Sequence, residues 1–354
     1  MSRFFSTRHI ALQPYVPGEQ PQNRAYIKLN TNESPFPPSA GVAKAVAQEY
    51  EQLPLYSDPE CRKLREAMAD VYGIAPSEVL MTNGSDASLF LAFSSFADVQ
   101  NPLVFPDITY GFYPVFASLC HIPYSVIPLR DDFTIDPASY CAIGKTVVLA
   151  NPNAPTGLAL SVQEIAQIAQ SNPDNVIIID EAYVDFGAES AVPLIKKYPN
   201  LLIIGTFSKS RSLAGARLGF CIGQKELIED LNTIRYAINP YNVNRMTAAA
   251  GIAALQQDAY YRENCRIIQE NRLWLTQQLQ AIGFTVLPSC ANFVFAKSDK
   301  LAGEALYRAL KERGILIRHF DIPRITDYNR ITIGTMEQMQ ALLHEIKEIL
   351  EVES

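Results

Sequence analysis

Seven short β-rich runs between residues 79 and 223 constrain the fold of this chain more than any other feature. Each run is four to seven residues long, and stretches that could form helices separate them. Val176-Ile177-Ile178-Ile179 is continuously apolar and is bounded by polar residues, as is typical of strands buried on both faces. The runs cover residues 79–82, 102–105, 124–127, 146–150, 176–180, 201–205 and 217–223. They predict an α/β fold with a mostly parallel seven-stranded sheet sandwiched by helices.

The rest of the chain predicts a second, smaller α+β unit. A long helical pattern at 247–281 contains no proline, and its only glycine, Gly251, is near its start. Beyond it, strands are predicted at 284–287, 292–296, 315–318 and 330–334, and helices at 301–313 and 337–352. The proline-rich beginning predicts an extended arm. We therefore expect an N-terminal arm (1–40) packing with the small domain, a large domain (41–250) and a small C-terminal domain (251–354).

Composition excludes several classes of partner. The 354 residues include 30 Lys and Arg against 37 Asp and Glu, so no overall positive charge attracts nucleic acid. The apolar stretches are far shorter than the roughly 20 residues that span a membrane, and the first residues lack the apolar core of a secretory signal. The six cysteines are at least 21 residues apart and the four histidines are scattered, so a metal site is not expected. We predict a cytoplasmic protein with no nucleic-acid, membrane or metal partner.

Polar clusters follow four of the predicted strands, where ligands bind in open α/β sheets. In the first cluster, Asn83-Gly84-Ser85-Asp86, a glycine and free amides at a helix N-terminus suit a phosphate, although Ser85 or Asp86 could equally be an ordinary cap. The second is the turn-rich loop 151–157. In the third, Asp180 ends an apolar run, where a carboxylate needs a positive or hydrogen-bonding partner. The fourth is Ser208-Lys209, with Arg217 eight residues later.

Taken together, these clusters match the requirements of one cofactor, pyridoxal 5′-phosphate. Its aldehyde needs a lysine, its pyridine nitrogen needs a carboxylate, and its phosphate needs amides, a hydroxyl and an arginine. Each cluster alone also has an ordinary structural interpretation. For the fourth cluster, for example, most lysines are simply solvated. The clusters follow one another in the chain order that this cofactor requires.

The chain resembles the fold-type I pyridoxal-phosphate enzymes over nearly its whole length, and among them the histidinol-phosphate aminotransferase family. The matching stretches are Leu29-Asn30-Thr31-Asn32-Glu33-Ser34-Pro35, Asn83-Gly84-Ser85-Asp86, 106–113, 152–157, 180–186, 208–219, 240–244, Ala291-Asn292-Phe293 and Arg330-Ile331-Thr332-Ile333-Gly334-Thr335. The resemblance implies a fold-type I aminotransferase with a large domain around the seven-stranded sheet and a smaller α+β domain.

The resemblance also implies roles for individual residues toward the cofactor. Lys209 would form the Schiff base and move the proton, Asp180 would pair with the pyridinium nitrogen, and Tyr183 would donate to the phenolic oxygen. Tyr110 matches the aromatic residue that stacks on the ring. Tyr56 resembles the tyrosine that reaches the phosphate in the neighbouring subunit, which implies a homodimer with shared active sites. The remaining implied cofactor-binding residues are Gly84, Ser85, Asp86, Asn153, Ser208 and Arg217.

For the substrates, Arg330 matches the arginine that binds a carboxylate through paired donors. Arg318, Tyr15 and Asn32 match further substrate-binding positions. The implied reaction converts histidinol phosphate and 2-oxoglutarate to imidazole acetol phosphate and glutamate, in two half-reactions of histidine biosynthesis. An aromatic amino acid aminotransferase and a threonine-phosphate decarboxylase on the same fold remain open, because small differences in loops decide between such substrates.

Two hypotheses from other classes are weaker. A dinucleotide-dependent oxidoreductase would need a Gly-x-Gly-x-x-Gly turn, and Gly215, Gly219 and Gly223 are spaced by four instead. A binding protein that kept the fold without catalysis would not need the complete set of acid, tyrosine, lysine and arginines.

The sequence departs from the family pattern at two positions. Ala154 replaces the asparagine that usually precedes Pro-Thr-Gly and bonds to the cofactor's phenolic oxygen. Either the neighbouring Asn153 substitutes from a shifted loop or Tyr183 makes the bond alone. The second departure is Arg211, where small and aromatic residues are commoner, and it is either a solvated residue or a contact to substrate.

Overall fold

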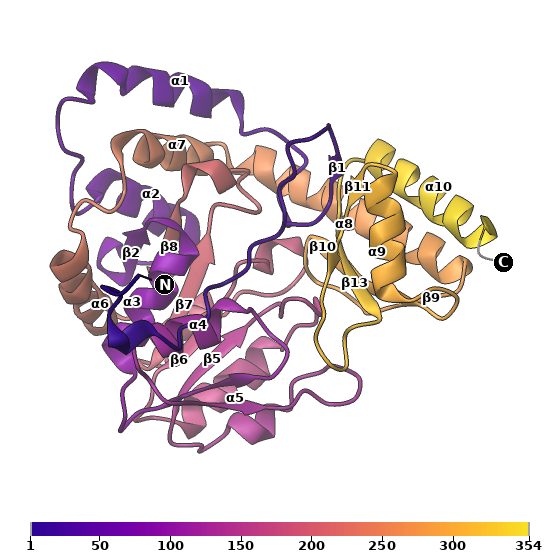
Figure 1. Ribbon diagram of the computed structural model, residues 1–354. Coiled ribbons are helices and arrows are strands. Elements are labelled where there is room, and N and C mark those ends of the chain that lie inside the picture. Colours follow the sequence, from indigo (N-terminus) through magenta and orange to yellow (C-terminus); the bar gives the residue numbers. More distant parts are fainter. Residues whose placement is uncertain (1, 353–354) are drawn as a thin grey trace.

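The computed structural model, which describes residues 2–352, contains a central sheet of seven strands (Figure 1). The strand order is β2-β8-β7-β6-β5-β3-β4. β8 pairs antiparallel with β2 and β7, and the other neighbours in the sheet are parallel, which confirms the predicted mostly parallel sheet. The strands are β2 (Val79–Thr82), β3 (Leu103–Pro106), β4 (Tyr124–Ile127), β5 (Thr146–Ala150), β6 (Ile177–Asp180), β7 (Leu201–Thr206) and β8 (Gly219–Ile222).

Helices cover both faces of this sheet. Every residue of β5, β6 and β7 is buried, and alternate residues contribute to two separate apolar clusters. One cluster joins the sheet to α2, α5 and α7, and the other joins it to α3, α4 and α6. Burial on both faces explains why these strands are continuously apolar in sequence. The helices are α1 (Ala40–Gln48), α2 (Arg62–Tyr72), α3 (Gly84–Phe96), α4 (Phe112–Leu119), α5 (Val162–Ser171), α6 (Lys225–Ile238) and α7 (Arg245–Gln256).

The helical pattern predicted at 247–281 forms two helices instead of one. α7 ends at Gln256, and α8 (Asp258–Ala281) begins after Gln257, whose φ of −113° and ψ of 36° are not helical. The break allows α7 to remain packed on the large sheet while α8 extends to the small sheet (Figure 1). Periodicity alone did not reveal this change of direction.

The second sheet is antiparallel and has the order β12-β13-β10-β9. The predicted strand at 315–318 is split, because β11 (Ile315–Leu316) pairs with β1 (Ile27–Lys28) of the arm while β12 (Arg318–His319) pairs with β13. α8, α9 and α10 supply residues to the apolar cluster of this sheet. The other elements are β9 (Phe284–Val286), β10 (Phe293–Ser298), β13 (Tyr328–Thr332), α9 (Gly303–Glu312) and α10 (Met336–Val352).

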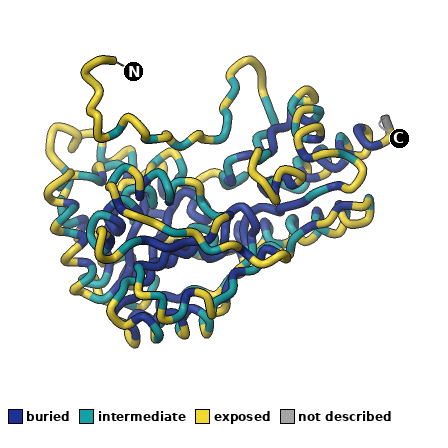
Figure 2. Tube along the Cα trace, turned by 60° about the horizontal axis from the view of Figure 1, so that its bottom comes forward, coloured by how far each residue is buried: buried dark blue, intermediate teal, exposed yellow. Residues whose placement is uncertain are grey.

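The N-terminal arm crosses the molecule with residues 2–26 all exposed or half-buried, whereas buried residues concentrate in the interior (Figure 2). We propose the division of the chain into an arm (1–40), a large domain (41–250) and a small domain (251–354). Residues 1, 353 and 354 of that division lie outside the described part of the chain. Short 3-10 turns occur at Thr7–His9, Tyr50–Gln52, Pro76–Glu78, Pro137–Tyr140, Val184–Phe186, Val192–Lys196 and Ala214–Ala216. No helix between residues 2 and 352 is both long and apolar enough to cross a membrane.

The contact between β7 and β8 depends on Gly205, since a Cβ atom there would lie 2.2 Å from Cζ of Phe220. We predict that Gly205→Ala lowers the free energy of unfolding by about 1–3 kcal/mol, because the ring would have to move within a packed core. Gly215→Ala is the matched control, since a Cβ at Gly215 meets no atom within 4 Å. Urea unfolding of both variants measures the difference, and equal stabilities would contradict the prediction.

Candidate active site

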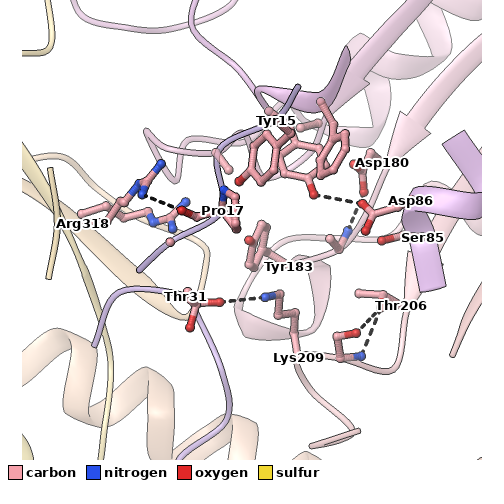
Figure 3. Close-up of a pocket in the computed structure, with 18 of the residues that line it drawn as sticks. Tyr15, Pro17, Thr31, Ser85, Asp86, Asp180, Tyr183, Thr206, Lys209 and Arg318 are labelled. Carbon is pink, nitrogen blue, oxygen red and sulfur yellow. Dashed lines mark hydrogen bonds between the residues drawn. The ribbon is translucent and has the colours of Figure 1, made fainter. Parts of the chain in front are cut away.

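A cavity of about 580 Å³ lies at the carboxyl ends of β5, β6 and β7 (Figure 3). Ala150, Asp180 and Thr206, the last residues of these three strands, line it. The arm and the small sheet also contribute to the wall. Because parallel strands end at the same edge of a sheet, side chains far apart in sequence meet here. The other lining residues include Tyr15, Thr31, Ser85, Asp86, Tyr110, Ala154, Tyr183, Ser208, Lys209, Arg217, Arg318 and Arg330.

Asp180 provides a buried carboxylate in this cavity. Its side chain accepts hydrogen bonds from the Tyr113 hydroxyl (3.0 Å) and from the backbone N–H of Ala182 (3.2 Å). Burial raises the pKa of Asp180 to about 6, although these two bonds favour the ionised form. Within the described residues, no cation forms an ion pair with this carboxylate. The position therefore suits a ligand that brings a positively charged N–H group.

The N-terminus of α3 lines the same cavity through Ser85 and Asp86 and has the features that an anion requires. Gly84 begins the helix with a φ of 79°, and a Cβ there would lie 2.5 Å from the guanidinium of Arg217. A Cβ at Gly219 would lie 2.4 Å from the carbonyl carbon of Gly84. The two glycines therefore allow the arginine and the strand β8 to approach the free amides of the helix. Free amides and the helix dipole both favour a phosphate at this point.

Arg217 and two hydroxyls complete this end of the cavity. The Arg217 guanidinium donates to a carboxylate oxygen of Asp86 (3.1 Å) and to Oγ of Ser208 (3.5 Å). Oγ of Ser208 also accepts from the Thr206 hydroxyl at 3.0 Å. Ser85, Ser208 and Arg217 thus face one space with hydroxyl and guanidinium donors, as a phosphate requires.

Lys209 follows β7 and projects into the middle of the cavity (Figure 3). Its ammonium group donates to the backbone carbonyl of Thr31 in the arm at 3.0 Å. The same nitrogen lies 5.7 Å from the ring centroid of Tyr183. The structure therefore brings the predicted amine, acid and tyrosine to one cavity, with Lys209 between the sheet and the arm.

Aromatic rings form a further wall of the cavity. The Tyr110 hydroxyl donates to Asp86 at 3.0 Å, and burial raises the pKa of Tyr110 well above its usual value. The ring of Tyr15 stacks on that of Phe112, with centroids 4.1 Å apart, and lies 6.1 Å from the ring of Tyr110. Tyr15 and Tyr110 therefore present flat apolar surface and protonated hydroxyl groups to the cavity.

Two arginines lie opposite each other on the small sheet and line the cavity together. Arg318 of β12 is the register partner of Arg330 of β13. Like charges directly opposite on neighbouring strands repel each other. Arg330 donates to the carbonyl of Asn30 (3.1 Å), but its Nε is buried without a hydrogen-bond partner, and burial lowers its pKa. An anion between the two side chains would satisfy the free donors and remove the repulsion.

The structure corrects the prediction for Asn153. Its amide donates to the Ile108 carbonyl (3.0 Å) and the Thr156 hydroxyl (3.1 Å), and its oxygen accepts from the Thr109 hydroxyl (2.8 Å). These bonds hold the side chain inside the loop, and Ala154 lines the cavity instead. Asn153 is therefore a residue that shapes its loop, since its polar atoms are already satisfied away from the cavity.

Asn32 is also placed differently from the prediction of a substrate contact. It is 1% exposed, does not line the cavity, and donates through its amide to the Tyr183 hydroxyl at 3.0 Å. Arg211, whose role the sequence left open, is buried away from the cavity, with its guanidinium 2.6 Å from a carboxylate oxygen of Asp258. Neither residue is placed to contact a substrate directly.

Tyr56 lies outside the cavity of its own chain. It is 80% exposed, and its ring stacks on Tyr241 at 4.5 Å. A role at another subunit's site is compatible with this exposure.

Sequence reasoning missed Tyr113 and Thr31. Tyr113 is fully buried, and its hydroxyl binds Asp180, whereas Thr31 acts only through its backbone carbonyl. An available signal was that Tyr113 belongs to the stretch 106–113, one of those that carry the family resemblance. A backbone carbonyl leaves no signal in the sequence.

The donor set fits pyridoxal 5′-phosphate. A buried carboxylate without a cation suits a pyridinium, a primary amine suits an aldehyde, and the glycine-bounded helix N-terminus with Ser208 and Arg217 suits a phosphate. The three features surround one cavity, which is large enough for a small cofactor together with a substrate.

Comparisons with known proteins agree with this reading. Residues 24–346 match the model of the family "Aminotransferase class I and II". Histidinol-phosphate aminotransferase 1 of Bradyrhizobium diazoefficiens is 47% identical over 99% of this chain and 100% of its own, and the histidinol-phosphate aminotransferase of a Marinomonas strain is 48% identical over 98% and 99%. The structure of the Sinorhizobium meliloti histidinol-phosphate aminotransferase in complex with pyridoxal 5′-phosphate superimposes with a TM-score of 0.85 at 26% identity, covering 94% of this chain and 92% of that one.

The chain belongs to the class I and II aminotransferases. The fold-type I architecture predicted from the sequence is confirmed by this family and by the solved structures.

A second buried acid lies next to the site of this aminotransferase. Glu181 is 6% exposed and accepts hydrogen bonds from the Ser190 hydroxyl and the Ala191 backbone N–H, both at 2.6 Å. Burial nevertheless raises its pKa to about 7. The folded protein therefore holds this proton in a pH range in which the unfolded chain has already released it.

We predict that the cofactor-free protein loses stability as pH rises from about 4.5 to about 7. In this window the native state binds more protons than the unfolded state, so the free energy of unfolding falls, by on the order of 3 kcal/mol for Glu181. Glu181→Gln should remove this part of the dependence. Urea unfolding near pH 4.5 and near pH 8, at one protein concentration, measures it. Asp180 lowers the stability over the same pH range in the wild type and in Glu181→Gln, because its pKa is also raised. A pH dependence in Glu181→Gln equal to that of the wild type would contradict the assignment to Glu181.

Proposed function

We propose that this aminotransferase transfers the amino group of histidinol phosphate to 2-oxoglutarate with pyridoxal 5′-phosphate, as a step of histidine biosynthesis. The observation that carries the proposal is the pair Arg318 and Arg330, which face the cavity that also contains Lys209. Two opposed arginines suit an anionic substrate, and both proposed substrates are anions, one a phosphate and the other a dicarboxylate. Curated relatives that match nearly the full length carry the name histidinol-phosphate aminotransferase.

The residues around Lys209 would hold the cofactor and move protons. When bound, pyridoxal 5′-phosphate supplies an electron sink for the bonds at the substrate's α-carbon. Lys209 is the amine that would bind its aldehyde carbon, and the freed amine of Lys209 would then carry the proton away from the α-carbon. Asp180, held by Tyr113, would keep the pyridine nitrogen protonated. Tyr183 would donate to the ring oxygen, and Tyr110 would cover the ring face.

The phosphate of the cofactor would bind at the N-terminus of α3. The amides of Gly84 and Ser85, the Ser208 hydroxyl and the Arg217 guanidinium are the proposed donors. Asp86 has a supporting role, since its carboxylate accepts from both Arg217 and Tyr110 and so fixes both side chains. Substrate anions would bind at Arg330 and Arg318, and Tyr15 would close the cavity over them.

We further propose a homodimer in which Tyr56 of each chain reaches the phosphate end of the other site. Large apolar side chains gather in the segment around Tyr56 and in the nearby stretch 236–241, and a cluster of this kind favours a protein interface. The exposed members are Tyr50, Leu53, Leu55, Tyr56, Tyr236, Ile238 and Tyr241. We place the enzyme in the cytoplasm, because its six cysteines are free thiols, as is usual in a reducing compartment.

We expect histidinol phosphate to convert the bound cofactor to its amine form, and 2-oxoglutarate to restore the original absorbance spectrum. The Lys209→Ala variant, loaded with the same cofactor, should show a rate at least about 10⁴ lower, because it lacks the group that moves the proton. Absorbance spectra of the loaded protein before and after each addition measure both half-reactions. Phenylalanine and threonine phosphate serve as comparison amines.

The possible outcomes test the amine donor and the cofactor site separately. Conversion by phenylalanine alone would favour an aromatic amino acid aminotransferase, and release of carbon dioxide from threonine phosphate would favour a decarboxylase. Either result would leave the cofactor site standing and reject the proposed amine donor. A protein that does not bind pyridoxal 5′-phosphate, or a Lys209→Ala variant that turns over normally, would reject the site itself.

The dimer proposal predicts that Tyr56→Phe raises the dissociation constant of the cofactor by about tenfold, because one hydrogen bond to a charged phosphate is lost. Tyr50→Phe is the matched control, since Tyr50 is similarly exposed (69%) on the same segment. Fluorescence titration with the cofactor and light scattering of the purified protein provide the two measurements. A monomeric protein, or equal cofactor affinities of the two variants, would reject the shared site.

A further inference from the structure

The Tyr183 hydroxyl is held by a partner that lies outside the cavity wall. Asn32 donates from Nδ2 to this hydroxyl at 3.0 Å, and no other described residue forms a hydrogen bond with it. A hydroxyl that accepts a hydrogen bond in this way keeps its own proton for donation in another direction. The ring of Tyr183 packs edge-on against Phe293 (5.2 Å between centroids) and lines the cavity, so its position is also fixed.

The orientation of the Asn32 amide is set by Thr332 of β13. The backbone N–H of Asn32 donates to the Thr332 hydroxyl (3.0 Å), and that hydroxyl donates its single proton to Oδ1 of Asn32 (2.9 Å). Oδ1 is therefore the atom that faces Thr332, and Nδ2 faces Tyr183. The three bonds form a directional chain that ends at the tyrosine hydroxyl.

The backbone around Asn32 is rigid enough to maintain this chain. Asn32 is 1% exposed and has a φ of 56°, a left-handed conformation that asparagine tolerates better than most residues. Its carbonyl accepts from the fully buried amide of Asn292 at 3.0 Å. The arm, the large domain and the small sheet thus meet at one asparagine, and the hydrogen bonds of Asn32 to Thr332, Tyr183 and Asn292 hold it in a single arrangement.

The wall beside Tyr183 has no second side-chain donor at the neighbouring loop position. Ala154 packs with Phe293 and Tyr183 and presents only a methyl group to the cavity, while Asn153 is turned into its loop. A ligand oxygen on this side of the cavity therefore depends on the Tyr183 hydroxyl for its hydrogen bond. The direction of that one proton consequently matters more here than it would in a wall with several donors.

We propose that Asn32 is a positioning residue that directs the Tyr183 hydroxyl proton into the cavity, where it binds the anionic ring oxygen of the cofactor. Thr332 acts one step further back by orienting the Asn32 amide. The proposal rests on the proposed cofactor but does not depend on which amine is the donor. Asn32 thereby sets the protonation behaviour of the bound cofactor without touching it.

Reversing the bond from Asn32 tests this proposal. Asn32→Asp replaces the amide donor by a carboxylate of the same shape. The carboxylate accepts a hydrogen bond from the Tyr183 hydroxyl, whose proton then no longer points into the cavity. Losing a donor to the ionised ring oxygen disfavours the deprotonated form of the bound cofactor. The pH midpoint of its absorbance titration should therefore rise by about one pH unit, since a hydrogen bond to a charged group has this effect. Tyr183→Phe should raise the midpoint by a similar amount, and Asn32→Ala by less.

A double variant separates the effect of the added aspartate charge from the effect of reversing the hydrogen bond. In the Tyr183→Phe background, Asn32→Asp retains its charge but has no hydroxyl to reverse, so its further effect on the midpoint should be small. An equally large shift in both backgrounds would reject the proposal in favour of a through-space charge effect. An unchanged midpoint in Asn32→Asp would also reject it.

Two further variants, Thr332→Val and Asn32→Ala, test the proposal even if Asn32→Asp does not fold. Thr332→Val removes the hydroxyl that orients the amide and should raise the midpoint in the same direction as Asn32→Ala. If both of these variants titrate like the wild type, Asn32 does not position Tyr183. Because the titration needs only bound cofactor, failure of histidinol phosphate as a donor would leave this result interpretable.

Discussion

The buried carboxylate of Asp180 is the constraint on which the rest of the site depends. A carboxylate at the end of a fully buried strand has lost its water, and a tyrosine hydroxyl and one backbone N–H do not replace a cation. The central position of β6 makes this possible, because β5 and β7 cover both of its edges. The same sheet edge then places Lys209 after β7 and the N-terminus of α3 after β2, so one topology delivers acid, amine and anion site together.

Much of this arrangement was predictable because it follows from local patterns. Short β-rich runs identified the seven strands, and the polar residues after them marked Asp180, Lys209 and the α3 N-terminus. The split of 315–318 was not predictable from the pattern, because it depends on Ile27 and Lys28 arriving from the other end of the chain. Asn153 and Asn32 show the same limit at the site. Both are polar residues next to cavity residues, and only the three-dimensional partners of their amides decide which way each side chain points.

The break at Gln257 illustrates a different reason for failure. The sequence there keeps its helical periodicity, since residues on both sides pack on apolar clusters, but the two clusters belong to different sheets. Periodicity shows that a residue is buried, but it does not show which element the residue packs against. Residues that act through the backbone, such as Thr31, or through a second side chain, such as Tyr113, are hidden from sequence reasoning in the same way.

The arm is part of the site because three of the four cations that line the cavity bind its backbone. Lys209 donates to the carbonyl of Thr31, Arg330 to that of Asn30, and Arg318 to the carbonyls of the segment 16–17. A carbonyl is a weaker partner for a cation than a carboxylate or a phosphate, since charge-assisted bonds between two ions are shorter and stronger. An anionic substrate between the arginines would therefore be a stronger partner than the arm carbonyls, and the free Nε of Arg330 is a donor that the arm does not use. The arginines that bind the arm are thus the same residues that face the proposed anion site.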